Sequence, residues 1–278
     1  MCEFCTKHGD GKKWYLQAKN YADDLASDLD RIEKTAERLK YFTDGRFRRD
    51  YRLMERGYPR MPERLQRVFA ARFTRQQKVS HFGQVLPIED VEKILPMVNS
   101  IVRLPCVCRK AVTGKEVAYC IGITTTPEST MGKLLCKSFD AGPDTAGVDR
   151  LTPEEALEFM RGLERKGVMH SVWTFETPFI GAICNCERTD CVATRATVDH
   201  GLKTMFKGEY IAEVNPDLCV GCGNCAELCQ FDAIVMADRK ACVDQSKCYG
   251  CGSCRAVCAK NAVTLLDRVA VPAVANDW

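Results

Sequence analysis

Eighteen cysteines among 278 residues are the side chains of this sequence best suited to chemistry. Eight of them form two runs of the same spacing, C-x2-C-x2-C-x3-C, and the second run begins 29 positions after the first. The first run comprises Cys219, Cys222, Cys225 and Cys229, and the second comprises Cys248, Cys251, Cys254 and Cys258. Such self-similarity indicates one structural unit that is duplicated within the chain.

This spacing is that of bacterial iron–sulfur ligation, in which the fourth cysteine of each run crosses to the other cluster. A tight loop can wrap three corners of a cubane, and a separate piece of chain must supply the fourth thiolate. Paired zinc ribbons are the alternative, but they use two separated C-x2-C pairs. The sequence predicts two [4Fe-4S] clusters, the first bound by Cys219, Cys222, Cys225 and Cys258 and the second by Cys248, Cys251, Cys254 and Cys229.

On these two runs, residues 211–268 resemble the two-cluster bacterial ferredoxin family. The resemblance implies two βαβ-like halves related by a pseudo-twofold axis. The apolar pattern agrees with four short strands, at Tyr210–Val214, Ala233–Met236, Ala241–Val243 and Ala262–Leu266. Gln230 and Ala259 depart from the family, which usually has proline after the fourth cysteine of each run.

Length and composition indicate what surrounds this unit. The chain is too long for a ferredoxin unit alone, so one or two further domains are expected. A hydrophobic content of 46% and a charged content of 28% are ordinary for a globular protein. No run of 18 apolar residues and no secretion signal is present, so neither a membrane span nor export is expected. So many cysteines indicate metal ligation in a reducing compartment, the cytoplasm of an anaerobe.

The N-terminal region, residues 1–80, is expected to be helical and basic. Cys2 and Cys5 open the chain in a C-x2-C pair that could hold part of a zinc or cluster site, the alternative being two buried thiols. Apolar residues at helical spacing predict one long amphipathic helix over residues 14–42. The basic stretch from Arg46 to Lys78 fits docking to an acidic partner or a solvated face better than nucleic acid, because the net charge is only +3.

Residues 81–210 are expected to form an α/β middle domain. The pattern predicts strands at Ile101–Leu104, Val117–Ile123, Val168–Phe175 and Phe179–Ile183, and helices at Ile88–Leu95, Thr152–Lys166 and Val192–Phe206. The helix after Thr152 opens with a capping box, because Thr152 is followed three residues later by Glu155. Residues 124–150 look like an extended loop.

A second group of cysteines lies in this middle region. Cys184, Cys186 and Cys191 share one loop at a strand end, and Cys106 and Cys108 share another. Three thiols in one loop and one from elsewhere again suit a cluster, so we expect a third [4Fe-4S] centre. Residues 81–206 also resemble the N-terminal module of some anaerobe iron–sulfur proteins, which implies the same centre. Ordinary buried thiols are the alternative.

The remaining cysteines and one histidine are given lesser roles. Cys120 is a reserve ligand, Cys136 and Cys242 fit no ligand spacing, and His170 is expected to be a core histidine.

Together these observations predict an α+β protein with a helical N-terminal segment, a cysteine-containing α/β middle domain, a ferredoxin-like pseudo-twofold domain at 211–268 and an apolar tail at 269–278. Fully ligated clusters pass single electrons and bind no substrate, and no nucleotide-binding or triad motif is present. We therefore expect an electron-transfer protein that serves a larger redox enzyme, with no small-molecule substrate.

A charge count favours a subunit over a free carrier. Six acidic and six basic residues balance between Asn215 and Arg268, whereas diffusing ferredoxins present acidic surfaces. The first alternative is an oxidoreductase with its own active site at the middle cysteine centre. The second is a redox-sensing regulator that binds nucleic acid through the basic stretch.

Overall fold

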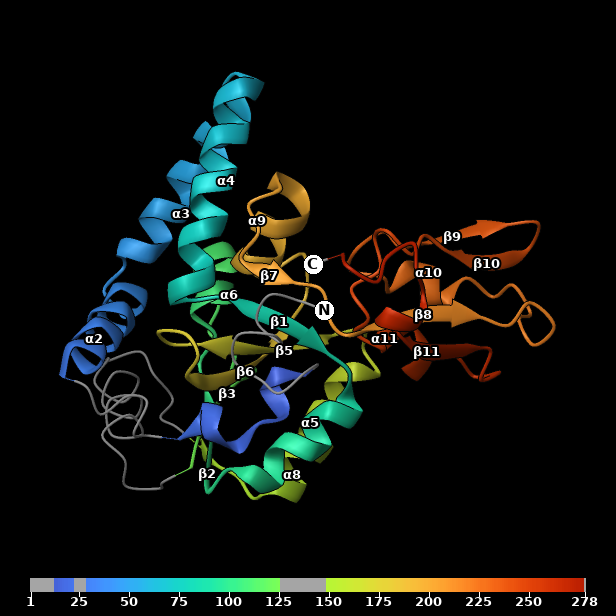
Figure 1. Cartoon of the computed structure of the whole chain (residues 1–278), viewed down its shortest axis with the longest axis horizontal. Helices are drawn as coiled ribbons and strands as arrows, with labels where there is room; N and C mark the ends of the chain where they lie inside the picture. Colours follow the sequence, from blue (N-terminus) through green and yellow to red (C-terminus); the bar gives the residue numbers. More distant parts are fainter. Residues whose placement is uncertain (1–12, 23–28, 126–148, 278) are drawn as a thin grey trace.

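The structure is a computed structural model that describes residues 13–22, 29–125 and 149–277. Figure 1 shows a larger part built on one sheet and a smaller C-terminal part beside it, so the predicted α+β fold is confirmed. In the described part of the chain, no helix is both long enough and apolar enough to cross a bilayer.

The larger part is organised around a seven-stranded sheet of order β4-β2-β3-β6-β5-β1-β7. Neighbouring strands are antiparallel except β1 and β7, which are parallel. The strands are β1 (Gly83–Leu86), β2 (Ser100–Leu104), β3 (Cys120–Thr124), β4 (Asp149–Arg150), β5 (Met169–Thr174), β6 (Ile180–Cys186) and β7 (Met205–Phe206).

Two groups of helices cover the two faces of this sheet. The helices are α2 (Leu29–Thr43), α3 (Arg46–Gly57), α4 (Glu63–Ser80), α5 (Ile88–Ile94), α6 (Val107–Thr113), α8 (Pro153–Glu164) and α9 (Val192–His200). Side chains alternate between the faces of a strand, so Val172 and Ile183 pack with α5 and α8. Their neighbours Trp173 and Ala182 face the opposite side, with Leu39 of α2 and Ala193 of α9.

The capping box at Thr152 is confirmed, because its hydroxyl accepts from Glu155 N at 3.2 Å and its own N–H donates to the Glu155 carboxylate at 2.8 Å.

Two other helix predictions were wrong, and the first of them was too long. The helix expected to reach Phe206 ends at His200, with Gly201 in the left-handed conformation, and Met205–Phe206 then pairs with β1 instead.

The single helix predicted over residues 14–42 was also wrong. Trp14–Leu16 and Ala18–Tyr21 form two short 3-10 helices, and α2 spans Leu29–Thr43. Tertiary anchoring explains the difference, because the buried Trp14 Nε1 donates to Gln84 Oε1 at 2.5 Å and the Tyr15 hydroxyl donates to Asp90 at 2.8 Å. Burial of these aromatic rings outweighs the helical periodicity that the sequence carries.

The C-terminal part is built from two similar halves. Its elements are β8 (Tyr210–Val214), α10 (Asn224–Glu227), β9 (Ile234–Ala237), β10 (Lys240–Val243), α11 (Ser253–Ala256), β11 (Val263–Asp267) and the 3-10 helix η6 (Arg268–Ala270). The first strand of the first half pairs with the last strand of the second, β8 with β11, and β9 pairs with β10. All four strands that the sequence predicts here form within one residue of their expected ends.

Polar contacts fix this part against the sheet domain. The Tyr210 hydroxyl donates to Asp90 of α5 at 3.0 Å. Arg268, which is only 3% exposed, donates to the carbonyls of Gly208 and Tyr210 at 2.8 Å each and to the carbonyl of Cys248 at 2.9 Å. The connection between the two parts is therefore held on both sides by side chains rather than left as a free linker.

Candidate iron–sulfur centres

The first cysteine of each run accepts the same pattern of backbone hydrogen bonds in the two halves of the C-terminal part. The Cys219 sulfur accepts from the backbone N–H groups of Gly221 and Ala241. The Cys248 sulfur accepts from Ala212 N at 3.4 Å and from the backbone N–H of Gly250. Sulfur atoms that accept backbone hydrogen bonds are stabilised as thiolates, which is the form that binds iron.

The glycines between the first two cysteines of each run are required by the shape of the loops. Gly221 and Gly250 have φ of 73° and 72°, the left-handed region that favours glycine. A Cβ atom on Gly221 would lie 2.1 Å from the Arg239 carbonyl oxygen, and one on Gly250 would lie 2.1 Å from that of Tyr210. Each loop therefore turns directly against the backbone of a neighbouring segment, and any side chain would open it.

The fourth cysteines are also held alike. Ala233 N donates to the Cys229 sulfur at 3.3 Å, and Ala262 N donates to the Cys258 sulfur at 3.3 Å. Each of these cysteines follows the short helix of its half, and the two helices α10 and α11 pack against each other. An equivalent N–H···S hydrogen bond thus orients the fourth cysteine of each half.

One predicted ligand set is visibly gathered around a small pocket. Cys229, Cys248, Cys251 and Cys254 all line it, although Cys229 comes from the other run. Burial, and then the nearby thiols, raise the pKa of Cys251 to about 12. A group that crowds four thiols in a dry site suits a cationic metal core, which removes both the desolvation cost and the mutual repulsion.

The other loop is more open to solvent. Cys222 is exposed, and backbone hydrogen bonds lower the pKa of Cys219 below its usual value. Cys225 is buried and lies within electrostatic reach of both. The two halves therefore differ in exposure although their backbones match.

Gln230 has a role that the sequence did not reveal. It follows Cys229 where the ferredoxin family usually has proline, and its Nε2 donates to the Gly167 carbonyl at 3.2 Å. Its Oε1 accepts from Arg188 N at 2.7 Å, in the loop between Cys186 and Cys191. The glutamine thus ties the end of the first cysteine run to the loop that carries the middle cysteines.

The middle cysteines converge because of strand register. In β6, Cys184 and Cys186 point to the same face as Ala182. The pairing of Ile121 with Ile183 places Cys120 of β3 beside Cys184. Cys106 and Cys108 lie at the start of α6, and Cys191 is the N-cap residue of α9. All five predicted residues and the reserve ligand Cys120 are thereby brought together.

Their sulfur atoms form one continuous group. The Cys120 sulfur lies 3.4 Å from that of Cys106 and 3.8 Å from that of Cys184. The Cys191 sulfur lies 3.4 Å from that of Cys186. Hydrogen-bonding contacts between Cys184 and Cys186 and between Cys108 and Cys191 complete the chain. Thiolates in this number are the donor set that iron–sulfur clusters use, so the residues present fit such a group.

These thiols form part of the wall of a cavity of about 380 Å³. The opposite wall is mainly aromatic and comes largely from helices α2, α3 and α4, with Phe42, Phe47, Phe69 and Phe73 among its residues. Sequence reasoning missed this cavity, because its two walls come from segments that are distant from each other along the chain. The amphipathic pattern of α2 was the one feature of the sequence that could have indicated an apolar wall here.

Arg109 is a positive charge within electrostatic reach of the middle thiols. It is 3% exposed, donates to Glu187 at 2.6 Å and to the Asn185 carbonyl at 3.3 Å, and lies over the Tyr119 ring. Burial lowers its pKa and the neighbouring thiols and Glu187 raise it, with a net rise. A guanidinium in this position stabilises negative charge on the sulfurs.

The remaining predicted residues lie elsewhere. Cys242 is exposed on β10, away from the thiol group. His170 is fully buried and burial lowers its pKa to about 4, which confirms a core histidine; its Nδ1 lies 2.6 Å from Asn185 Oδ1, while its Nε2 has no hydrogen-bond partner among the described residues. Cys2, Cys5 and Cys136 lie outside the described residues.

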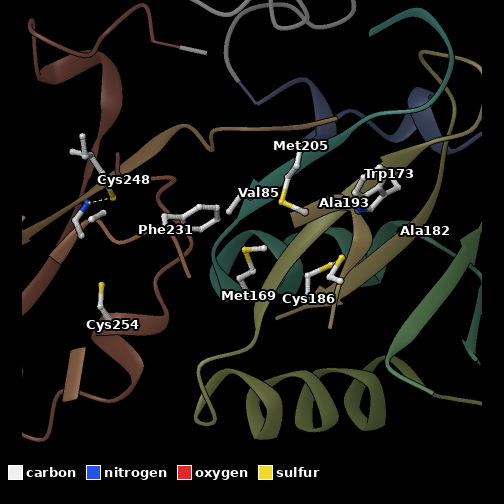
Figure 2. Packing of buried hydrophobic residues seen from close by; sticks show 14 of the residues in the cluster. Val85, Met169, Trp173, Ala182, Cys186, Ala193, Met205, Phe231, Cys248 and Cys254 are labelled. Atoms are coloured by element: carbon white, nitrogen blue, oxygen red, sulfur yellow. Dashed lines mark hydrogen bonds between the residues drawn. The ribbon is translucent and has the colours of Figure 1, made fainter. Parts of the chain in front are cut away.

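An apolar bridge connects the two groups of thiols. In Figure 2, Phe231 and Met169 lie between Cys248 and Cys186, and all four belong to one hydrophobic cluster. Met169 is the register partner of Cys186, and the Phe231 ring stacks on Tyr249 at 4.0 Å. The ferredoxin-like part and the middle thiols are therefore in packed contact.

Comparison with known proteins agrees with this geometry at its C-terminal end. Residues 212–235 match the family model of a 4Fe-4S binding domain. A ferredoxin of Rickettsia felis is 41% identical over 49 residues, which are 18% of this chain and 40% of that ferredoxin. The chain contains a ferredoxin-type iron–sulfur domain. That domain binds at least one [4Fe-4S] cluster and supports a role in electron transfer.

Proposed function

We propose that this protein relays single electrons through two ferredoxin-type [4Fe-4S] clusters and a third centre in the sheet domain. The matched surroundings of the two cysteine runs carry the proposal, since each repeats the same glycine turn and the same N–H···S hydrogen bonds. The first cluster is assigned to Cys219, Cys222, Cys225 and Cys258, and the second to Cys248, Cys251, Cys254 and Cys229. When bound, these clusters supply one-electron redox chemistry.

The third centre is assigned to Cys184, Cys186, Cys191 and Cys108. The sequence left the choice between Cys106 and Cys108 open. The hydrogen-bonding contact with Cys191 favours Cys108. Cys106 instead contacts Cys120.

The proposed path has a buried end and an open end. The second site adjoins the sheet domain through Phe231 and Gln230, so it is the neighbour of the third centre. Cys222 of the first site is exposed, and the apolar side chains of Leu218 and Val220 beside it are 49% and 62% exposed. Electrons would enter or leave the chain at this open loop.

We further propose that a larger redox enzyme docks at the open loop. The balanced charges of residues 215–268 suit a partner whose contact surface is uncharged rather than strongly acidic or basic. Exposed Val235 and Met236 on β9 extend the apolar surface, and the core of an interface is depleted in charge. Such a protein belongs in a reducing compartment, for which the cytoplasm of an anaerobe is the natural proposal.

Metal analysis with single variants tests the cluster assignments. The full chain, purified without oxygen, should hold about twelve irons and as many sulfides. Cys108→Ser should lose about four irons, while the matched control Cys242→Ser, at an exposed thiol outside the group, should lose none. An iron content of about eight, or zinc in place of the last four irons, would refute the third centre and leave the ferredoxin-type clusters standing.

Docking is tested separately. Leu218→Asp together with Val220→Asp should weaken co-purification with the partner from the native source, because charge is placed in the apolar contact. Val269→Asp, at a residue 42% exposed in the tail, is the control. Unchanged co-purification of the double variant with full iron content would place the interface elsewhere.

A further inference from the structure

The middle thiol group contains more sulfur than one cubane needs. Six cysteines among the described residues line the cavity, whereas a fully ligated [4Fe-4S] cluster takes four. If Cys108, Cys184, Cys186 and Cys191 hold the third centre, Cys106 and Cys120 are left over. These two are not scattered, because their sulfurs lie 3.4 Å apart.

The backbone holds this leftover pair together from both sides. Leu104 of β2 pairs with Cys120 of β3, so Cys106 lies just beyond the end of the paired strands. Cys106 N donates to the Val117 carbonyl at 2.8 Å, which closes the loop between the two strands. Tyr119 N donates to the Cys106 sulfur at 3.1 Å and fixes its direction. A bond between the sulfurs would require them to approach from 3.4 Å to about 2.05 Å.

From this arrangement we infer that Cys106 and Cys120 form a redox-active dithiol that collects two electrons and passes them to a small, uncharged organic disulfide bound in the chamber. The inference rests on the proposed iron–sulfur function, since the clusters of the same chain are the source of the electrons. With this dithiol the protein would have a catalytic activity of its own, in which clusters that carry one electron each support a two-electron reduction.

The reaction balances as ordinary thiol–disulfide exchange. The sulfur of Cys106 or Cys120 attacks one sulfur of the organic disulfide, forms a mixed disulfide and releases one thiol. The second cysteine then attacks the first, which releases the other thiol and leaves a Cys106–Cys120 disulfide. Two electrons, which the proposed iron–sulfur clusters would supply when bound, and two protons from water would convert that disulfide back to two thiols.

The chamber defines the class of substrate. Cys106 is 3% exposed, so a protein disulfide on a folded surface cannot reach it. The cavity of about 380 Å³ has the size of a small-molecule pocket, and its far wall is built from aromatic rings such as Phe42, Phe47 and Phe73. A low-molecular-weight aromatic or aliphatic disulfide without charge fits both the volume and the lining.

The test uses the full chain with its clusters, in a Cys242→Ser background that removes an exposed thiol outside the proposed ligand sets. The protein is treated without oxygen with 4,4′-dithiodipyridine, an uncharged aromatic disulfide, and free thiols are then blocked with N-ethylmaleimide. Mass spectrometry of the peptides should find Cys106 joined to Cys120, with the iron content unchanged. Reduced methyl viologen, a one-electron donor, should then remove the cross-link.

Two further variants separate the possible failures. Cys106→Ser and Cys120→Ser should each abolish the cross-link and keep about twelve irons, whereas a loss of about four irons would make that cysteine a ligand and overturn the inference. A fully loaded chain that yields no cross-link, or a cross-link that persists after cluster reduction, would also overturn it. An iron content of about eight with an intact cross-link would refute the third centre and support the dithiol, so the two failures are distinguishable.

Discussion

Replacing Gly221 with alanine should remove the first cluster and leave the rest of the chain folded. Gly221 has φ of 73°, and its Cβ would lie 2.1 Å from the Arg239 carbonyl oxygen. The left-handed conformation alone costs a non-glycine residue about 1–2 kcal/mol. The clash adds to this, because carbon and oxygen approach only to about 3.3 Å even in close contacts. The loop must therefore move by about an ångström, which would carry Cys219 and Cys222 out of position.

A matched control lies two residues away. Gly223 has φ of 82°, but a Cβ there would meet nothing within 4 Å. Gly223→Ala should therefore lose only about 1–2 kcal/mol of unfolding free energy and keep all its iron. Gly221→Ala should lose about four irons per chain. The mirror variant Gly250→Ala should remove the second cluster in the same way, because its Cβ would lie 2.1 Å from the Tyr210 carbonyl oxygen.

The assay is iron and sulfide content per chain, with electron paramagnetic resonance of the reduced protein to identify which cluster is missing. Thermal unfolding of the same samples separates a local loss from general misfolding. If Gly221→Ala retained full iron and the same stability as Gly223→Ala, the close backbone approach would not matter for the cluster and the reasoning would be wrong.

Three further predictions concern the sheet domain and its contact with the ferredoxin-type part. Gln230→Ala removes the hydrogen bonds to Gly167 and Arg188, so the free energy of unfolding should fall by about 1–3 kcal/mol while the iron content stays unchanged. An unchanged free energy of unfolding would contradict the role of Gln230 in joining the two parts. Burial, and then Glu89, raise the pKa of Glu164 to about 7. The native carboxyl therefore keeps its proton where the unfolded one has lost it, and stability in urea titrations should fall as pH rises from about 4.5 to about 7. Glu164→Gln should flatten this slope, and a wild-type slope that survives in the variant would refute the assignment. Arg109→Met should lower iron at the third centre through loss of positive charge at the thiols; full iron there would refute that role.

The sequence determined the ferredoxin-type unit almost completely. Ligand spacing, the glycines within each run and the four strands are local features, and each depends on residues close together in the chain. The proposal that the fourth cysteine of each run crosses to the other cluster came from the same repeat. Local chemistry was sufficient here because a cluster loop is a short, self-contained turn.

The sequence was less informative where distant segments decide the outcome. It indicated a middle cysteine group but could not choose between Cys106 and Cys108, and it held Cys120 only in reserve. Strand register made the difference, because the antiparallel pairing of β3 with β6 sets Cys120 beside Cys184. Register is a long-range property that depends on which strands pair, and no local pattern contains it.

Tertiary packing alone decided the rest. The single helix predicted over residues 14–42 does not form, because Trp14 and Tyr15 are buried and donate hydrogen bonds to the sheet and to α5. The aromatic wall opposite the thiols and the tie made by Gln230 depend on contacts between segments far apart in the chain. The sequence by itself thus determined which cysteines make ferredoxin-type loops, and only the folded chain decided which of the other thiols share a chamber. The physical reason is that cluster loops are fixed by local turns, whereas a chamber is fixed by how whole elements pack.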